Sequence, residues 1–242
     1  MLHKTRGIVF HTVKYGENGI VVKIFTESSG LQSYIINSVR SKKGKFKPSV
    51  FEPLSLVELV SEQKENRGLQ RIKEIRTQPV FHSIPDDMVK SSILMFLNEV
   101  LYKSIQQQGH IDHPLFNFIF NSIQILDLET EIHPDFHLFF MVQLSRYLGF
   151  FPHGDYSDDC PYFDLKEGCF IPSVDSPHFT LDKELSGMLF NLIQTDYDHL
   201  SEIKISSPKR RLLLNRLLLY FELHISSFRN MKTPEILHEI LK

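Results

Sequence analysis

A short segment of the chain concentrates positive charge with no acidic residue to balance it. Five basic side chains lie within eight residues, and they are Arg40, Lys42, Lys43, Lys45 and Lys47. Lysine and arginine at this density neutralise phosphate groups, so a phosphodiester backbone is the ligand that such a segment suits best. We expect the segment to bind a polyanion. The plain alternative is a solvated loop whose lysines only aid solubility.

The net charge of −2 over 242 residues hides an asymmetry. Residues 1–80 hold 14 Lys and Arg against 7 Asp and Glu, whereas residues 81–242 hold 13 against 22. A basic first third joined to an acidic remainder indicates two surfaces that meet different partners.

Phosphate-loop and metal patterns receive little support. Gly44-Lys45 resembles the end of a P-loop, but Val39 and Phe46 occupy positions where that motif needs a glycine and a hydroxyl residue. His133 and His137 have helical i, i+4 spacing, yet the glutamate of HExxH is absent and Pro134 places the first histidine just outside the helix. Core-edge or solvated histidines are the favoured interpretation.

The segment around residues 150–180 holds two cysteines and a group of acids. Cys160 and Cys169, with His153 and His178 nearby, have the residue types of a zinc site, but neither cysteine belongs to a CxxC pair. The acids are Asp155, Asp158, Asp159 and Asp164. They lack the spacing of a calcium loop, and a solvated acidic loop is the favoured interpretation over a divalent cation site. No serine or cysteine stands in an activating motif, so the chain is not expected to be an enzyme.

The elements that must position the basic segment read as a small β-barrel. Five runs rich in β-branched and aromatic residues are separated by turn-forming residues; they span 7–14, 19–27, 31–39, 54–62 and 69–77. Closure of such a sheet removes its exposed edges, so a five-stranded barrel is predicted over residues 1–80, with an SH3-like barrel as the alternative.

Aromatic residues and further lysines lie close to the basic segment in this predicted barrel. Phe46, Phe51 and Tyr34 are expected to stack on bases, and Tyr15 is also near. Lys14 and Lys23, on neighbouring strands, are expected to extend the cationic surface. Cations for phosphates beside rings for bases are typical of barrels that bind single strands.

After residue 80 the apolar spacing becomes helical. Helices are predicted from Val89 to a stop at Gly109, from Asp112 and Pro114 through Leu126, and from Pro134 to Gly149. An irregular loop or small hairpin insertion follows at about 150–180. Further helices are predicted from Asp182, from Ser207-Pro208 to about Phe228, and after Thr233-Pro234. The expected fold class is α+β, with a barrel over 1–80 and a mainly helical domain over 81–242.

Read as a whole, the sequence resembles the RecO family of bacterial DNA repair and recombination mediators. Four stretches carry the resemblance: TRGIVFHTVKYGENGIVVKIFTESSG at 5–30, SVRSKKGKFKPSVFEPLSLVEL at 38–59, FHLFFMVQLSRYLGFFP at 136–152 and SPKRRLLLNRLLLYFELHI at 207–225. Their order and spacing, over nearly the full chain, make the case more than any one of them alone.

The resemblance implies an N-terminal OB-fold and a helical C-terminal domain. It further implies binding of single- and double-stranded DNA, annealing of complementary strands, and cooperation with RecR to load the RecA recombinase on DNA coated by the single-stranded DNA-binding protein SSB. The alternatives are an RNA-binding barrel protein and, less favoured, a metal-dependent nuclease that uses the acids of the insertion.

Many relatives in this family carry a four-cysteine zinc module at the insertion. Here Cys160 matches the first ligand, Phe163 stands at the second position, and no second CxxC follows. A zinc-ribbon-like shape without its zinc is therefore expected, and no cofactor is predicted.

The family's SSB partner has a C-terminal tail that is acidic and ends in an apolar residue, which requires a receptor with cations beside an apolar groove. The candidates, at the start of the leucine-rich helix predicted from Ser207, are Lys209, Arg210, Arg211 and Arg216. The alternative is that these cations only keep a core helix soluble. No membrane segment or signal peptide is predicted, and we expect a cytoplasmic, nucleoid-associated protein.

Overall fold

The structure is a computed structural model that describes residues 2–37, 46–62, 68–105 and 111–241. The chain forms two compact units, unit 1 (Met1–Glu129) and unit 2 (Thr130–Lys242). Arg40, Lys42, Lys43 and Lys45 of the basic segment, and the helix stop predicted at Gly109, lie outside the described residues.

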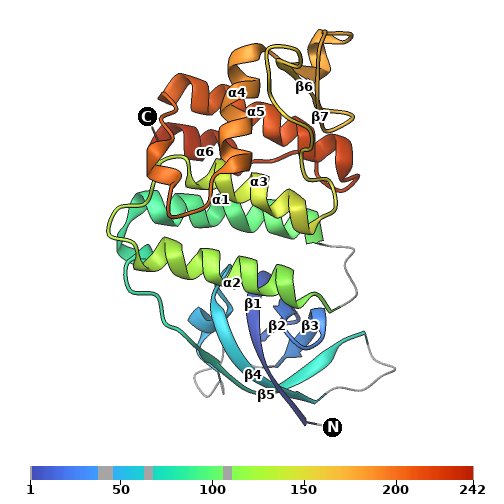
Figure 1. Ribbon diagram of the computed structural model, residues 1–242. Coiled ribbons are helices and arrows are strands. Elements are labelled where there is room, and N and C mark those ends of the chain that lie inside the picture. The colour runs from blue at the N-terminus through green and yellow to red at the C-terminus, as the bar shows by residue number, and fades with distance from the viewer. Residues whose placement is uncertain (1, 38–45, 63–67, 106–110, 242) are drawn as a thin grey trace. The chain divides into compact units, whose positions relative to one another are not determined.

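The predicted five-stranded barrel is confirmed. Its strands are β1 Leu2–Tyr15, β2 Gly19–Thr26, β3 Gly30–Ile36, β4 Leu56–Glu62 and β5 Gln70–Thr77. They close in the order β1-β2-β3-β5-β4, with β3 and β5 parallel and every other pair antiparallel. This is the five-stranded OB-fold barrel, which appears in Figure 1 as the blue and cyan strands.

The barrel closes around alternate side chains of its strands because successive residues of a strand point to opposite faces. On β2 the inward residues are Ile20, Val22 and Ile24, all buried. The core cluster also contains Val9, Tyr34, Ile36, Val50, Phe51, Val57, Leu59 and Ile72. Val50 and Phe51 belong to the short 3-10 helix η1, Pro48–Phe51, which follows the basic segment.

Two helices complete unit 1: α1 Met88–Ile105 and α2 His113–Leu128. The side chain of Asp112 accepts a hydrogen bond from Leu115 N at 2.9 Å, which confirms the predicted start of α2. Phe116 of α2 packs on Phe25 of β2, with ring centroids 5.9 Å apart. The Arg6 guanidinium lies over Phe120 of the same helix at 4.8 Å. The barrel and α2 therefore pack against each other through aromatic rings.

A polar joint fastens the chain that leaves the barrel to the end of α2. The buried Asp127 carboxylate accepts hydrogen bonds from the backbone N–H groups of His82, Ser83 and Ile84 at 2.9 to 3.1 Å. Lys90 is fully buried beside it, and its ammonium donates to Ser83 Oγ at 2.6 Å and to the Glu129 carbonyl. Because each buried polar group has a partner, this joint holds the start of α1 and the end of α2 together.

Unit 2 is mainly helical, in agreement with the helices predicted after Pro134, while the predicted domain boundary at residue 80 stays a prediction. Its helices are α3 Phe136–Tyr147, α4 Lys183–Gln194, α5 Ser207–His224 and α6 Thr233–Ile240 (Figure 1). His133 lies before α3, in agreement with the sequence analysis. The Asp182 side chain accepts from Leu185 N at 2.9 Å and caps α4 as expected. Helix α5 ends at His224, four residues before the predicted end.

The insertion is a small sheet rather than a loop without regular structure. Its strands are β6 Tyr162–Asp164, β7 Cys169–Ile171 and β8 Thr180–Leu181, in the order β7-β6-β8. Phe163 and Phe170 face each other across β6 and β7, with ring centroids 5.1 Å apart, and Tyr220 of α5 packs on Phe163 at 5.8 Å. Aromatic packing therefore stabilises this hairpin. One of its rings, Phe163, stands where relatives are expected to have a zinc ligand. The zinc-ribbon-like character of the insertion stays a prediction.

Candidate nucleic-acid interface

The aromatic residues predicted to stack on bases are largely internal. Tyr34 is 0% exposed and Phe51 is 4% exposed, and both belong to the barrel core. Burial raises the pKa of the Tyr34 hydroxyl. A ring enclosed in this way offers no face to a base, so the expectation is corrected for these two residues. Their β-favouring, apolar character signalled packing instead of binding.

Phe46, the third predicted stacking residue, lies at the edge of this core. It is half-buried, packs against the core cluster, and meets Phe51 edge to face with centroids 6.3 Å apart. Lys47 follows it directly, is exposed, and precedes η1. At the described end of the basic segment, one accessible cation therefore lies next to one partly accessible ring.

Lys14 and Lys23 lie on opposite faces of the β1–β2 ladder. Lys14 is paired with Ile20, on the side that faces the barrel interior, but it lies beyond the last buried residue of β1 and is exposed. Lys23 is paired with His11 on the outer face, and its ammonium lies 5.4 Å from the centre of the Tyr102 ring of α1. The two lysines thus occupy the same half of the barrel without forming one flat patch.

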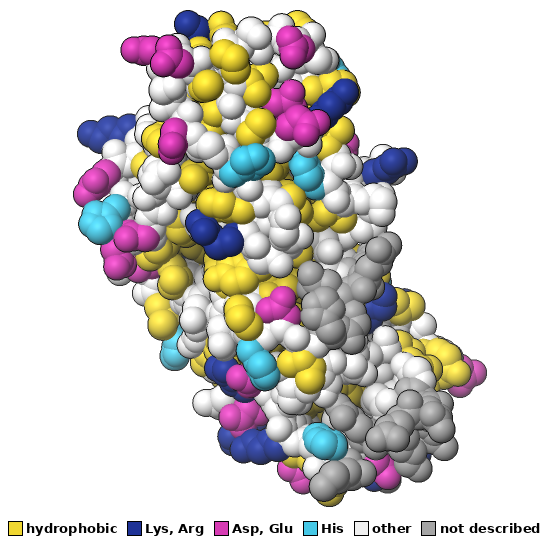
Figure 2. Space-filling view, turned by 45° about the vertical axis from the view of Figure 1, so that its right-hand side comes forward, with side chains coloured by type: hydrophobic (Ala, Val, Ile, Leu, Met, Phe, Trp, Pro, Cys, Tyr) yellow, Lys and Arg dark blue, Asp and Glu magenta, His cyan; other side chains and the backbone are white. Residues whose placement is uncertain are grey.

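Several other barrel cations are paired with carboxylates. Arg6 binds Glu27 through two hydrogen bonds of 2.9 and 2.7 Å. Lys4 and Arg76 both contact Glu58, at 3.6 and 2.7 Å. On the face shown in Figure 2, described Lys and Arg side chains are accordingly interspersed with Asp and Glu. Within the described residues, Lys14 and Lys23 form no ion pair with a carboxylate.

The cations predicted on the leucine-rich helix separate into different environments in unit 2. Lys209 is paired with Glu184 of α4. Arg216 donates a hydrogen bond of 2.7 Å to the Thr180 carbonyl. Arg210 donates from Nε to the buried Asp135 carboxylate at 2.5 Å and from a terminal nitrogen to the Ile205 carbonyl at 3.0 Å. Only part of this predicted cluster is therefore accessible.

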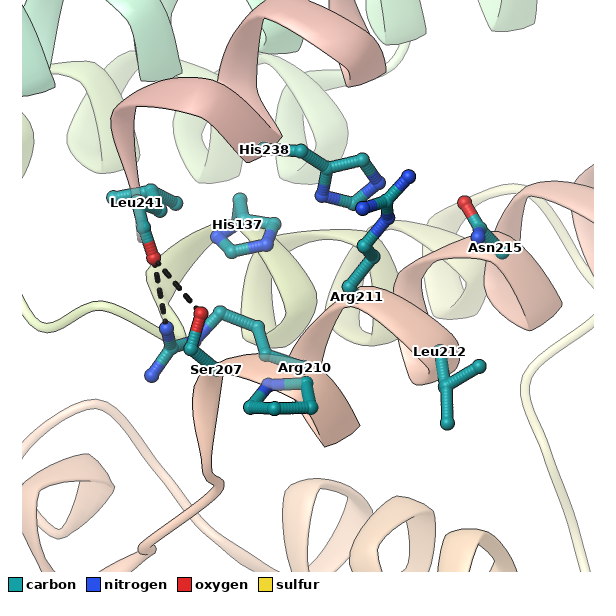
Figure 3. A pocket seen from close by; sticks show the side chains of 9 residues that line it. His137, Ser207, Arg210, Arg211, Leu212, Asn215, His238 and Leu241 are labelled. Atoms are coloured by element: carbon teal, nitrogen blue, oxygen red, sulfur yellow. Dashed lines mark hydrogen bonds between the residues drawn. The ribbon is translucent and has the colours of Figure 1, made fainter.

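Arg210 and Arg211 line one pocket of about 440 Å³ between α3, α5 and α6. Its other lining residues are His137, Ser207, Pro208, Leu212, Asn215, His238 and Leu241. Figure 3 shows Ser207 and Arg210 directed at the Leu241 carbonyl, with hydrogen bonds of 3.3 and 3.4 Å, while Arg211 lies beside His238. Burial, and then Arg211, lower the pKa of His238. The exposed Arg211 is thus the accessible cation of this pocket.

From the sequence, His137 was considered only as a possible metal ligand beside His133, and His238 was not named. His137 comes from α3 and His238 from α6, about one hundred residues apart in the chain, so no local spacing joins them to the basic residues of α5. The only available signal was the helical periodicity of α3, which places His137 among buried residues.

Among the residues that the structure describes, the candidate metal ligands do not form a group large enough to hold an ion. Within the described parts of the chain, no group of three or more His, Cys, Asp or Glu side chains is arranged to hold a metal ion. Cys160 and Cys169 are both free thiols, and burial raises the pKa of Cys169. Asp164 accepts hydrogen bonds from the backbone of Lys166 and Glu167, so it stabilises the β6–β7 turn. No helix of the described chain has the length and apolar character needed to cross a bilayer.

Comparisons with known proteins agree with this architecture. A family model described as "Recombination protein O N terminal" matches residues 1–80, and one described as "Recombination protein O C terminal" matches residues 85–233. Proteins named "DNA repair protein RecO" are similar over almost their whole length. The chain is 34% identical to the one from Azobacteroides pseudotrichonymphae genomovar. CFP2 and 36% identical to the one from Christiangramia forsetii, each over 241 residues and 99% of both chains.

A third relative, from Bacteroides fragilis, is 35% identical over 243 residues, again covering 99% of both chains. The matches extend over the barrel, its helices and the helical unit. This chain belongs to the RecO family of DNA repair proteins.

Proposed function

We propose that this protein binds single- and double-stranded DNA and anneals complementary strands. We further propose that, with RecR, it helps to load RecA on DNA coated by SSB. The observation that carries the proposal is a closed OB-fold barrel, in a RecO-family chain, whose first 80 residues hold twice as many basic as acidic residues. The relatives are named as DNA repair proteins, which favours DNA over the RNA alternative. We place this action in the cytoplasm, at the nucleoid.

The mechanism requires no bond-making step. Complementary strands gain free energy when they pair, and the repulsion between their phosphates slows their approach. A cationic surface that holds one strand lowers this repulsion, and the counterions released on binding make the affinity depend on salt. We assign this role to Arg40, Lys42, Lys43, Lys45 and Lys47, with Lys14 and Lys23 as extensions and Phe46 as an adjacent ring.

The test is reversal of three charges in the basic segment, Lys42→Glu, Lys43→Glu and Lys45→Glu. Each phosphate contact contributes about 0.7 to the slope of log affinity against log salt for single strands, so the slope should flatten by about 2. Affinity should fall alike for all sequences. Binding measured by fluorescence anisotropy at several salt concentrations provides both quantities.

The matched control reverses three charges on β5, Arg71→Glu, Lys73→Glu and Arg76→Glu. It changes the net charge equally, but Lys73 and Arg76 are already paired with Glu62 and Glu58. This control should change the slope much less. Equal slopes for the parent and the basic-segment variant would reject the assignment. Annealing assayed on bare and on SSB-coated DNA, with and without RecR, then separates a mediator from a general DNA-binding protein.

We propose that unit 2 receives the SSB tail at the start of α5, where the expected cations are Lys209, Arg210, Arg211 and Arg216. The pocket in Figure 3 supports this placement because it combines the apolar Leu212 with the accessible guanidinium of Arg211. Since Arg210 is already bound to Asp135, Arg211 is the residue best placed to meet an incoming carboxylate.

A further inference from the structure

An apolar strip lies on the outer face of the barrel, at the end of β1. It consists of Val13, Tyr15, Val21 and Ile35. Val13 is paired with Val21, and Val21 with Ile35, so these three side chains form one row across β1, β2 and β3. Tyr15 lies two residues beyond Val13 on the same face. The opposite face holds the buried core.

Tyr15 is the most unusual member of this strip. Its side chain is 54% exposed, and it is the one aromatic residue of the described chain that is exposed rather than buried or half-buried. Burying an aromatic ring is favourable. An exposed ring at the end of a barrel strand therefore indicates a binding site more strongly than an exposed aliphatic side chain does.

The residue paired with Tyr15 explains its exposure. That residue is Gly19, which has no side chain to cover the ring. A Cβ atom at this position would lie 2.7 Å from the Tyr15 carbonyl oxygen and 3.2 Å from the Ile36 carbonyl oxygen, so the close approach of the strands excludes a larger residue. The side of the ring toward β2 therefore has no cross-strand partner.

Positive charge lies near the strip. Lys23 shares its outer face, two residues along β2 from Val21, and Lys14 precedes Tyr15 directly but lies on the opposite face of β1. Neither lysine is paired with a described carboxylate, in contrast to Lys4 and Arg76 of the same barrel. Glu17, in the turn between β1 and β2, is the nearest acid in the sequence. The surroundings of the ring are therefore suited to an anionic ligand that has flat apolar groups.

We propose that Tyr15 stacks on an unpaired base of a single-stranded polynucleotide, with Val13, Val21 and Ile35 flanking the base and Lys23, on the same outer face, directed to the phosphates. The inference rests on the DNA-binding function proposed above, and it names a residue that contacts single strands. A base in a duplex has both faces covered by its neighbours, so the ring discriminates between single and double strands. Stacking of this kind accepts any base because each has a π-face.

The chain contains no tryptophan, which allows a direct test. In the Tyr15→Trp variant the single indole reports stacking, because a base in contact with it quenches its fluorescence. Addition of oligo(dT) should quench this signal, whereas an abasic strand of the same length should not. The matched control is Leu2→Trp, at a residue that is 64% exposed on the same strand but at its other end; its signal should stay unchanged.

Affinity supplies a second readout. Tyr15→Ala should weaken binding of oligo(dT) by about tenfold, and Tyr15→Phe should restore it, since stacking needs the ring and not the hydroxyl. The slope of log affinity against log salt should be the same in all three proteins because no charge is changed. Binding of duplex DNA should change by less than about twofold.

The outcomes separate this inference from the function on which it rests. A parent protein that binds no DNA would overturn both. A parent that binds oligo(dT), together with an unquenched Tyr15→Trp signal and an unchanged affinity of Tyr15→Ala, would overturn the stacking role alone. A salt slope that flattens in Tyr15→Ala would also overturn it, because the substitution would then have disturbed the phosphate contacts.

Discussion

The predicted binding cations at the end of the barrel and those of α5 differ in how they are paired in the structure. Lys14 and Lys23 remain without a described carboxylate partner. Lys209 and Arg210 are paired with Glu184 and Asp135, which are 25 and 75 residues away in the chain. The absence of acids nearby in a sequence therefore says little about pairing in the fold, because tertiary contacts bring acids from distant elements.

The largest effect expected from this difference is on stability. Arg210 is mostly buried beside Asp135, which is 1% exposed, so Arg210→Ala would leave a buried carboxylate uncompensated. We expect a loss of about 3 kcal/mol in the free energy of unfolding, measured by urea denaturation. Arg211→Ala, at the exposed neighbour, is the matched control and should cost less than about 0.5 kcal/mol.

A double variant sharpens the same test. Removing both charges, with Arg210→Leu and Asp135→Asn together, should recover much of the lost stability because no unpaired charge remains. If Arg210→Ala proved as stable as the parent, the pair would be a surface interaction, and Arg210 would be as available to a ligand as Arg211.

A second, smaller effect concerns pH. Burial, followed by the charge of Arg210, lowers the pKa of His137 to about 3, so this histidine is neutral in the folded unit. The unfolded chain takes up a proton as the pH falls below about 6.5, and the folded state does not until about pH 3. The stability that the neutral His137 contributes is therefore fully present above about pH 6.5, and it decreases as the pH falls from there toward about pH 3.

The loss should amount to roughly 1 to 2 kcal/mol between about pH 6.5 and about pH 5. His137→Gln, which has no titrating group, should make urea denaturation less dependent on pH over this range. Replacement of the exposed His199, whose pKa is raised by its hydrogen bond to Asp196, provides a control with the opposite sign. An unchanged pH dependence in His137→Gln would show that another group is responsible.

The smallest effect concerns ligand binding at α5. Arg211→Gln should weaken the binding of an acidic C-terminal peptide of SSB by about tenfold, because the Arg211 guanidinium is the accessible charge of the pocket. Lys209→Gln, on the same helix but paired with Glu184, should leave the affinity nearly unchanged. Isothermal titration with the peptide measures both. Similar losses in the two variants would indicate a general attraction instead of a defined site.

Much of the fold followed from local pattern. Runs rich in β-branched residues, such as 19–27, predicted the strands of the barrel, and Asp112 and Asp182 marked helix starts that the structure confirms. Such signals act within a few residues, and the sequence displays them directly. The closure order of the strands depends on pairing between distant segments, and the structure supplies it.

The site was less accessible to sequence reasoning. Tyr34 and Tyr15 are both tyrosines in strands near the basic segment, yet one is enclosed and the other exposed. Their difference depends on strand register, which pairs Tyr34 with the buried Val22 and Tyr15 with Gly19. Register is set by contacts between strands, so composition and spacing along one strand do not reveal it.

The joint at Asp127 also determines where the chain can be divided. It lies beyond the first 80 residues, yet it fixes the segment that leaves the barrel, and Phe116 and Phe120 of α2 cover Phe25 and Arg6. A recombinant fragment that ended at the boundary between the two family matches would lose this cover and expose aromatic surface to the solvent. The compact unit that contains the barrel extends to Glu129, so a fragment that ends there is the one we expect to keep the barrel intact.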